Sequence, residues 1–332
     1  MTEIHRGDYG FRSLMAVSSK SDCIPAVSID SALVTALRET PGTGKVHSVF
    51  ERAINILAPW GQLVSLAARQ LDDAPWTIRA EVRDWNAAGI QAGDPADFST
   101  RGISFDSAGS VVLLTGAREW FAKRIPLADF TTAELASGAA ALGELLEAHG
   151  VRGGILEASA AAGEAPKPGS TAFDAGIAEG LRAGREALET AVRAGDRTDI
   201  GEAALQLLGL GSGLTPAGDD FLCGLALLAA QPGSRLGAAR EALSAVVGQH
   251  ADRTTLLSWT TLREAVDGRV RESLLELLSQ LFRHKAEDPA GLARLLRAPV
   301  DRALGIGHTS GTDILSGLLA GLRLETELRG SM

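Results

Sequence analysis

The sequence predicts an α+β protein in which a small N-terminal β-rich domain precedes a larger all-α domain. Short runs of alternating apolar and polar residues crowd the first third of the chain, and Ala- and Leu-rich segments fill the rest. In addition, one unit made of a Gly-rich loop, an Asp and a helix occurs twice in the helical part. We place the β-rich domain at residues 20–130 and the all-α domain at residues 131–328.

The β-rich prediction rests on four short segments with apolar residues at alternate positions or in brief runs. They are KVHSVF (45–50), TIRAEV (77–82), ISF (103–105) and SVVLLT (110–115), with Gly, Pro, Asp or Ser around them. Alternation bounded by turn-forming residues is typical of strands. We therefore expect four or five strands in a small sheet or barrel.

Helical patterns begin after Pro126. Residues 131–150 have a polar start, an Ala/Leu body and a Gly at the end, as in a capped helix. Further helical segments are FDAGIAEGLRAGREALETAVRAG, RLGAAREALSAVVGQH and RESLLELLSQLFRHK. We expect eight or nine helices, and a loop or short linker over the Gly/Ala/Pro-rich residues 153–170.

Composition and charge exclude several classes of function. The 332 residues carry a net charge of −9 without a Lys/Arg-rich run, whereas nucleic-acid binding needs a clustered basic surface. The same deficit disfavours an anionic membrane surface. The longest uncharged apolar stretch, near 221–230, is about half a membrane span. Because the N-terminus lacks the long apolar stretch of a signal peptide, we expect a cytoplasmic protein with neither nucleic acid nor membrane as a partner.

The glycine-rich segment GSGLTPAGDDFLCGLALL (211–228) resembles a second segment, GIGHTSGTDILSGLLAGL (305–322). At an offset of 93 residues, Asp220 aligns with Asp313 and Gly224 with Gly317. Glycine inside a helix costs about 0.5–1 kcal/mol relative to alanine, so two such glycines indicate close approach of two backbones. We expect two pseudo-symmetric helices that cross near these glycines, with both loops facing one cleft.

Three interpretations of the paired loops remain open. An Asp at a helix start is an ordinary N-terminal cap, because its carboxylate accepts hydrogen bonds from free N–H groups. The same N–H groups can instead bind a ligand anion. Finally, Asp219, Asp220 and Asp313, with Thr215 nearby, are hard oxygen ligands that suit Mg²⁺.

Common catalytic motifs are absent from the sequence. PGTGKVHS (41–48) is not a P-loop, because Glu39 stands where the first Gly belongs and Val46 follows the Lys. HExxH and GxSxG do not occur, and the six His residues are scattered. Two cysteines that lie 200 residues apart predict neither a disulfide framework nor a zinc knuckle.

Residues 253–268, RTTLLSWTTLREAVDG, place several hydroxyl side chains on a predicted helix. Hydroxyl residues usually lower helix propensity, so their concentration calls for a reason. They either line the cleft or bond back within the packed helix, and the sequence favours neither interpretation.

The segments GLGSGLTPAGDD, TTLLSWTTLREAVDG and HTSGTDILSGLLAGL together resemble the AllH-like family, which is linked to oxamate carbamoyltransferase. GKVHSVFERAINI (44–56) resembles the N-terminal motif of that family, so the resemblance spans about residues 44–322. Two positions depart from the family pattern, which has Pro in place of Ser212 and often Ser in place of Ala217. The second departure removes a hydroxyl group from the loop.

The resemblance implies a subunit of a multi-protein enzyme of purine and allantoin catabolism. That enzyme interconverts oxalurate and phosphate with oxamate and carbamoyl phosphate, and preorganised N–H donors suit such anions. The residues expected to take part in catalysis are Asp219, Asp220 and Asp313, as orienting groups or ligands of a cation, and His308, as a polar contact. The residues expected to bind substrate are Gly211, Gly213 and Gly218, through their backbone N–H groups, and Thr215, Thr309, Ser310 and Arg253, through their side chains.

Two other functions stay open beside this one. The first is a non-catalytic member of the complex, whose partner subunits perform the chemistry. The second is a Mg²⁺-dependent hydrolase built on the Asp and Thr side chains of the loops, and Mg²⁺ is the one cofactor that we consider.

Overall fold

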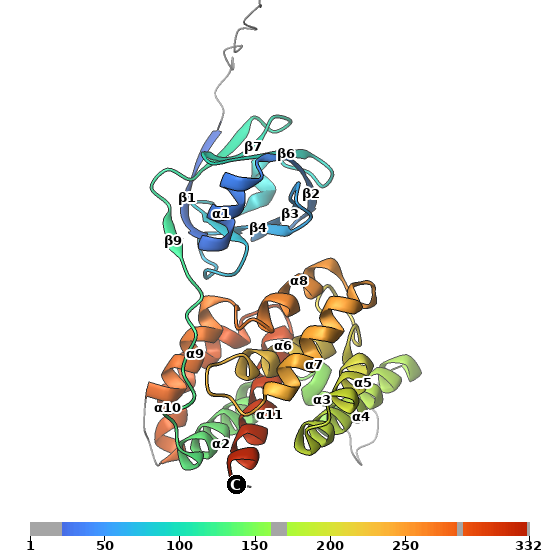
Figure 1. The fold of residues 1–332 in the computed structure, drawn as a ribbon. Coiled ribbons are helices and arrows are strands. Elements are labelled where there is room, and N and C mark those ends of the chain that lie inside the picture. Colours follow the sequence, from blue (N-terminus) through green and yellow to red (C-terminus); the bar gives the residue numbers. More distant parts are fainter. Residues whose placement is uncertain (1–21, 161–170, 284–287, 331–332) are drawn as a thin grey trace, which may run out of the picture.

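The computed structural model describes residues 22–160, 171–283 and 288–330. Strands over residues 22–120 form a closed barrel, and α-helices follow from Thr132 onward (Figure 1). This arrangement confirms the predicted α+β class. Residues 161–170 of the expected linker lie outside the described residues, as do residues 284 and 285 of the last helical segment quoted above.

Nine strands occur in the described part of the chain, where the patterns predicted four or five. They are β1 (Asp22–Asp30), β2 (Gly42–Val49), β3 (Ala53–Leu57), β4 (Leu63–Ala68), β5 (Thr77–Ala80), β6 (Pro95–Ser99), β7 (Gly102–Phe105), β8 (Ser110–Leu113) and β9 (Arg118–Trp120). The four quoted segments coincide with β2, β5, β7 and β8. The search for alternating residues did not find β3 and β4. Most of their residues are buried, so neither strand has a regular polar face.

The barrel closes through β1. The strand order is β5-β4-β3-β2-β6-β7-β8-β1-β9, and β1 also pairs with β5. The first part of β1 runs parallel to β8 and the last part runs parallel to β9. Fully buried apolar side chains, among them Ile54, Ile56 and Leu66, fill the core. Helix α1 (Ser31–Glu39) adds Leu33 and Leu37 to this core.

Ten α-helices and a short 3-10 helix (Ala251–Arg253) follow the barrel within the described residues. The α-helices are α2 (Thr132–His149), α3 (Gly154–Ala160), α4 (Ala172–Ala194), α5 (Arg197–Leu207), α6 (Ala217–Ala229), α7 (Gly237–Gln249), α8 (Leu256–Ala265), α9 (Glu272–Arg283), α10 (Pro289–Leu304) and α11 (Ser310–Gly330). The prediction of eight or nine helices was therefore too low. The expected loop over 153–170 was wrong in its first part, where α3 forms.

Helix α2 shows the capping predicted for residues 131–150. The Thr131 hydroxyl accepts a hydrogen bond from the Glu134 N–H at 3.2 Å, and the Glu134 carboxylate accepts one from the Thr131 N–H at 2.8 Å. This reciprocal pair satisfies two N–H groups that a helix start otherwise leaves free.

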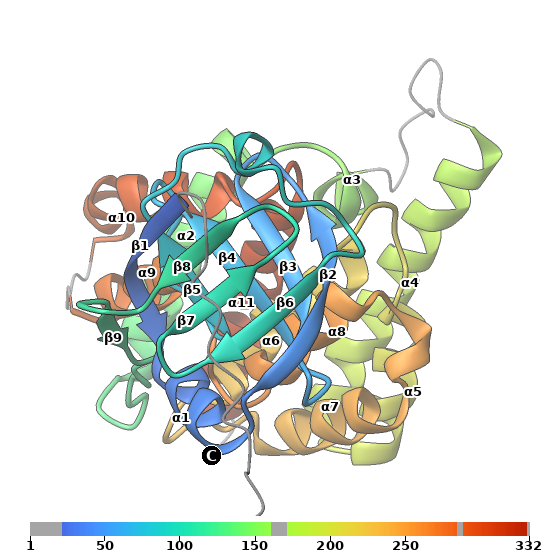
Figure 2. The ribbon, with the colours of Figure 1, turned by 90° about the horizontal axis from the view of Figure 1, so that it is seen from above.

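Helices α6 and α11 form the centre of the helical part (Figure 1). Every residue of α6 is buried, which explains its continuous run of apolar side chains. Seen from above, the barrel strands lie over these two helices (Figure 2). No helix of the described residues is long and apolar enough to span a membrane.

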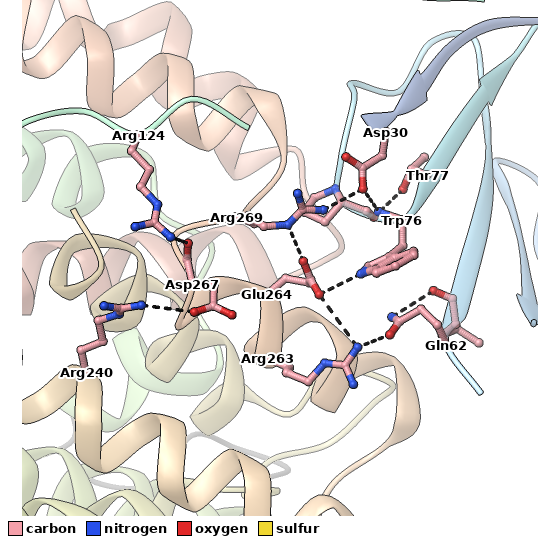
Figure 3. Close-up of polar contacts among 12 residues, drawn as sticks. Asp30, Gln62, Trp76, Thr77, Arg124, Arg240, Arg263, Glu264, Asp267 and Arg269 are labelled. Atoms are coloured by element: carbon pink, nitrogen blue, oxygen red, sulfur yellow. Dashed lines mark hydrogen bonds and ion pairs between the residues drawn. The ribbon is translucent and has the colours of Figure 1, made fainter. Parts of the chain in front are cut away.

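The barrel contacts the helical part through polar side chains at the end of α8 and just after it (Figure 3). The indole N–H of Trp76 donates to Glu264 at 2.8 Å, and Arg269 contacts Asp30 at 2.7 Å and Glu264 at 2.6 Å. Arg263 donates to the side-chain oxygen of Gln62. Because Asp30 is almost fully buried, this ion pair holds α8 at a defined place against the barrel.

Candidate functional site

Two matching loop-and-helix units meet in the helical part: α5 leads through a glycine-rich loop into α6, and α10 leads through a similar loop into α11. Matching backbone hydrogen bonds fold the two loops. They run from Leu210 N–H to Leu207 O (2.9 Å) and from Gly218 N–H to Leu210 O (2.9 Å), and from Ile306 N–H to Ala303 O (3.1 Å) and from Gly311 N–H to Ile306 O (3.0 Å). The sequence repeat is therefore a repeat of local structure.

The two helices cross at the glycines that the repeat singled out. A Cβ atom on Gly224 would lie 1.9 Å from the Ile314 carbonyl oxygen, and one on Gly317 would lie 1.9 Å from the Phe221 carbonyl oxygen. Both distances are far below van der Waals contact, so only glycine permits this approach. The predicted close crossing of two pseudo-symmetric helices is confirmed.

The loops meet through two hydroxyl groups. Thr215 Oγ1, from the first loop, lies 2.8 Å from Ser310 Oγ, at the start of α11. Both hydroxyls also hydrogen-bond to the carboxyl group of Asp220, in the first turn of α6. Thr215 and Ser310 are partly exposed, whereas Asp220 retains only 3% of its accessible surface. The hydroxyls thus lie between solvent and a buried carboxyl group.

Asp219, the neighbour of Asp220, faces a different environment. Its carboxylate accepts hydrogen bonds from the Gly209 N–H at 2.7 Å, from the Ser258 hydroxyl at 2.7 Å and from the Thr254 hydroxyl. These contacts tie the glycine-rich loop to the start of α8, the helix whose other end contacts the barrel. Asp219 therefore holds the loop in place, and hydroxyls of the 253–268 segment serve this packing.

Asp313 is the counterpart of Asp220 in α11 and is fully buried. Its Oδ1 accepts a hydrogen bond from the Ile155 N–H at 2.8 Å, and its side chain also bonds to Thr309. Gly154 has a φ of +52°, and a Cβ there would lie 2.5 Å from Asp313 Oδ1. Glycine at this position therefore allows the backbone at the start of α3 to close on the carboxyl group.

Burial dominates the electrostatics of Asp220 and Asp313. Burial raises the pKa of Asp220 to about 8, against the hydroxyls of Ser310 and Thr215, and the nearby Asp313 charge raises it further. Burial also raises the pKa of Asp313 to about 7, against the Ile155 N–H and Thr309. In each of the two carboxyl groups, Oδ2 is buried and has no hydrogen-bond partner among the described residues.

Three glycine residues were expected to donate backbone hydrogen bonds to the substrate. The N–H group of Gly218 already donates to the Leu210 carbonyl oxygen inside the loop. Gly211 and Gly213 have φ values of +129° and +95°, which favour glycine. A Cβ on Gly211 would lie 2.5 Å from the Ala217 nitrogen, so the loop backbone packs tightly against the start of α6.

His308 and Arg253 are exposed. The Arg253 carbonyl oxygen packs against Gly209, where a Cβ would lie 2.1 Å away, so this residue supports the loop through its backbone. Neither side chain contributes to the hydrogen bonds described above for the three aspartates. The structure thus brings Thr215 and Ser310 to Asp220, and Thr309 to Asp313, rather than uniting all the predicted side chains.

A metal site receives no support from the described residues. They contain no group of three or more His, Cys, Asp or Glu side chains that could hold a metal ion. Asp219, one of the three predicted carboxylate ligands, already receives three hydrogen bonds.

Sequence reasoning missed the start of α3. The Val151 N–H donates to the Thr312 hydroxyl at 2.9 Å, and the Ile155 N–H reaches Asp313. The one local signal is the glycine pair Gly153–Gly154, whose φ values of +136° and +52° favour glycine. The sequence pattern alone assigns this pair to a linker, since glycine is equally common in loops.

Two family models match the chain. Residues 207–322 match the family model described as oxamate carbamoyltransferase subunit AllH. Residues 25–119 match the model of the AllH family N-terminal domain. The two ranges together cover more than half of the chain. No solved structure matches it.

Proposed function

The chain belongs to the AllH family of oxamate carbamoyltransferase subunits, and from this premise we propose that it binds a small carbamoyl-bearing anion where its two glycine-rich loops meet. The observation that carries the proposal is the contact between Thr215 and Ser310 beside the buried carboxyl group of Asp220. Loops that merely capped two helices would not need shared hydroxyl groups and unpaired buried oxygens.

The proposed reaction transfers a carbamoyl group between phosphate and oxamate. In the direction of oxalurate synthesis, the oxamate nitrogen forms a bond to the carbamoyl carbon. The bond from this carbon to the phosphate oxygen breaks, and its electron pair leaves with phosphate. The oxamate nitrogen also loses one proton, so the reaction needs a proton acceptor beside the amide.

The loops offer what these groups require. Thr215, Ser310 and Thr309 supply partly exposed hydroxyl groups from the two repeated units. The N-termini of α6 and α11 add the partial positive charge of a helix start, which favours an anion. Donors held by tightly packed glycine backbones would stabilise charge on the carbamoyl or phosphate oxygens without reorganisation.

We further propose that partner subunits complete the enzyme, in keeping with the word subunit in the family description. Purine or allantoin breakdown and a cytoplasmic location are part of the same proposal. The alternative within this assembly is a chain that supplies contacts while partner subunits do the chemistry. Catalytic activity of the isolated chain distinguishes the two.

Thermal unfolding of the purified chain tests the proposal. The wild type and Asp220→Asn are compared with and without carbamoyl phosphate, phosphate, oxamate and Mg²⁺. A ligand at 100 times its dissociation constant stabilises the fold by about 2.7 kcal/mol. Stabilisation of the wild type, but not of the folded variant, by carbamoyl phosphate or oxamate supports the site. Stabilisation by Mg²⁺ alone would favour the hydrolase, and no shift with any ligand would reject the proposal for the isolated chain.

A further inference from the structure

Helix α4 is the longer arm of a helical hairpin. It has 23 residues, whereas α5 has 11, and a turn at Gly195 joins the two. At a rise of 1.5 Å per residue, α4 is about 35 Å long and α5 about 17 Å. Because the arms are antiparallel and packed together, the first part of α4 extends past the end of α5. Figure 2 shows the start of α4 projecting from the rest of the helical part.

One face of α4 packs against α5 and against the loop that follows α5. A Cβ on Gly184 would lie 2.9 Å from the side chain of Leu207, the last residue of α5. A Cβ on Gly180 would lie 3.0 Å from the side chain of Leu210. Leu210 belongs to the glycine-rich loop of the candidate site, so this face of α4 borders that loop.

Phe173 continues the same face beyond the packing of the chain itself. It lies seven residues before Gly180 and eleven before Gly184, a spacing that places all three on one side of the helix. Ile177, between them, is partly buried against the core. Phe173 is 74% exposed, more than any other large apolar side chain of the described residues. The packing face therefore runs past the last residue that covers it.

Gly176 is a second unusual residue in the projecting part of α4. Glycine weakens a helix relative to alanine, because it gives the unfolded chain more conformational freedom. At Gly224 and Gly317 a closely packed backbone explains the glycine. At Gly176 no atom of the described residues lies within 4 Å of an added Cβ. A backbone from another chain, crossing α4 one turn from Phe173, supplies the missing reason.

The family description identifies the kind of chain that covers this face. It calls the chain a subunit of a carbamoyltransferase, so the enzyme offers other subunits as neighbours. The face leads to the glycine-rich loop, in which Leu214 is also 52% exposed. The segment before α4, AAGEAPKPGS (161–170), contains no aromatic residue and no Leu, Ile, Val or Met with which to cover Phe173.

We infer that the start of α4, with Phe173, Gly176 and Ile177, docks a partner subunit of the carbamoyltransferase, which rests on the function proposed above. The partner presents an apolar pocket to Phe173 and lays a backbone across Gly176. Buried aromatic side chains are typical anchors of such interfaces. Docking at this place brings partner side chains next to the glycine-rich loop, where the proposed reaction needs a proton acceptor.

Surface plasmon resonance with the full chain immobilised tests the inference. The probes are the companion subunits of the same carbamoyltransferase, co-expressed and purified. Phe173→Ser should weaken their binding about thirtyfold, as expected for the loss of an interface anchor. The matched control is Leu295→Ser, which removes a 50% exposed apolar side chain from α10 and should bind as the wild type does.

Gly176→Ala separates docking from folding, because it should change the two in opposite directions. The melting temperature of the free chain should rise, since alanine favours the helix. Affinity for the companion subunits should fall about tenfold, since the added Cβ meets the partner backbone. Gly248→Ala, at an equally open glycine of α7, should raise the melting temperature and leave the affinity unchanged.

Unchanged affinity in Phe173→Ser and Gly176→Ala overturns the inference, and so does a wild type that does not bind the companion subunits. Sedimentation identifies other occupants: a wild-type dimer that Phe173→Ser abolishes would assign the face to a second copy of the chain. A lower melting temperature of Phe173→Ser with unchanged affinity would place Phe173 against its own chain. Each of these results also overturns the inference. Ligand-induced stabilisation is measured on the isolated chain, so the proposed anion site stands or fails separately.

Discussion

The close crossing of α6 and α11 supports a quantitative prediction. A Cβ at Gly224 would lie 1.9 Å from the Ile314 carbonyl oxygen, whereas ordinary contact begins at 3.4 Å. Gly224→Ala therefore requires a local displacement of about 1.5 Å between two helix backbones. Overpacking with such a backbone shift costs about 3 kcal/mol. Alanine returns about 1 kcal/mol through helix propensity, which leaves a net loss of about 2 kcal/mol.

Urea unfolding followed by circular dichroism measures this loss in the free energy of unfolding. In a thermal melt of the same variant, the melting temperature should fall by roughly 4–8 °C. Gly176→Ala is the matched control, because this exposed glycine of α4 has nothing within 4 Å of the added Cβ. The control should gain about 0.5–1 kcal/mol. The reasoning is refuted if Gly224→Ala is as stable as the control.

The double variant Gly224→Ala/Gly317→Ala adds a second check. A Cβ at Gly317 meets the Phe221 carbonyl oxygen from the opposite side of the same crossing. One separation of the helices relieves both overlaps, so the double variant should lose less than the sum of the two single losses. Strict additivity would show that the two glycines do not share one crossing.

Two further predictions concern charge. Because the pKa values of Asp220 and Asp313 are raised above the unfolded value of 3.8, the folded state keeps protons that the unfolded chain releases. The free energy of unfolding should therefore fall as pH rises from 5 to 7, by about 1.4 kcal/mol per pH unit for each protonated group. Asp220→Asn should remove one such share from the slope in urea titrations, and an unchanged slope would contradict the assignment. Arg269→Ala leaves the buried Asp30 without its cation and should cost about 3 kcal/mol in the same assay. Arg197→Ala breaks an exposed ion pair and should cost less than about 1 kcal/mol. Equal losses in the two variants would show that burial does not determine how much an ion pair contributes to stability.

The sequence determined more of the helical part than of the barrel. The repeat at an offset of 93 residues predicted the crossing at Gly224 and Gly317, because only glycine lacks the Cβ that keeps two helices apart. The capped helix over residues 131–150 was equally predictable, since capping is local. Strands β3 and β4 were not predicted. Most of their residues are buried on both faces, so their sequences lack the alternation of apolar and polar residues.

The candidate site shows where local reasoning ends. Asp219 and Asp220 are identical neighbours in the sequence, and nothing local assigns them different roles. Thr254 and Ser258 bind the first, whereas Thr215 and Ser310 bind the second. Some of these partners lie tens of residues away along the chain, so their approach depends on packing.

The sequence by itself thus determined the α+β class, the paired loops and the helix crossing, all of which follow from periodicity or from the missing glycine side chain. Only the tertiary structure decided which carboxyl groups are satisfied and which remain unpaired. It also brought Ile155 from an expected linker to Asp313. The physical reason is that burial and hydrogen-bond partners, which set the protonation of a carboxyl group, come from segments distant in the chain.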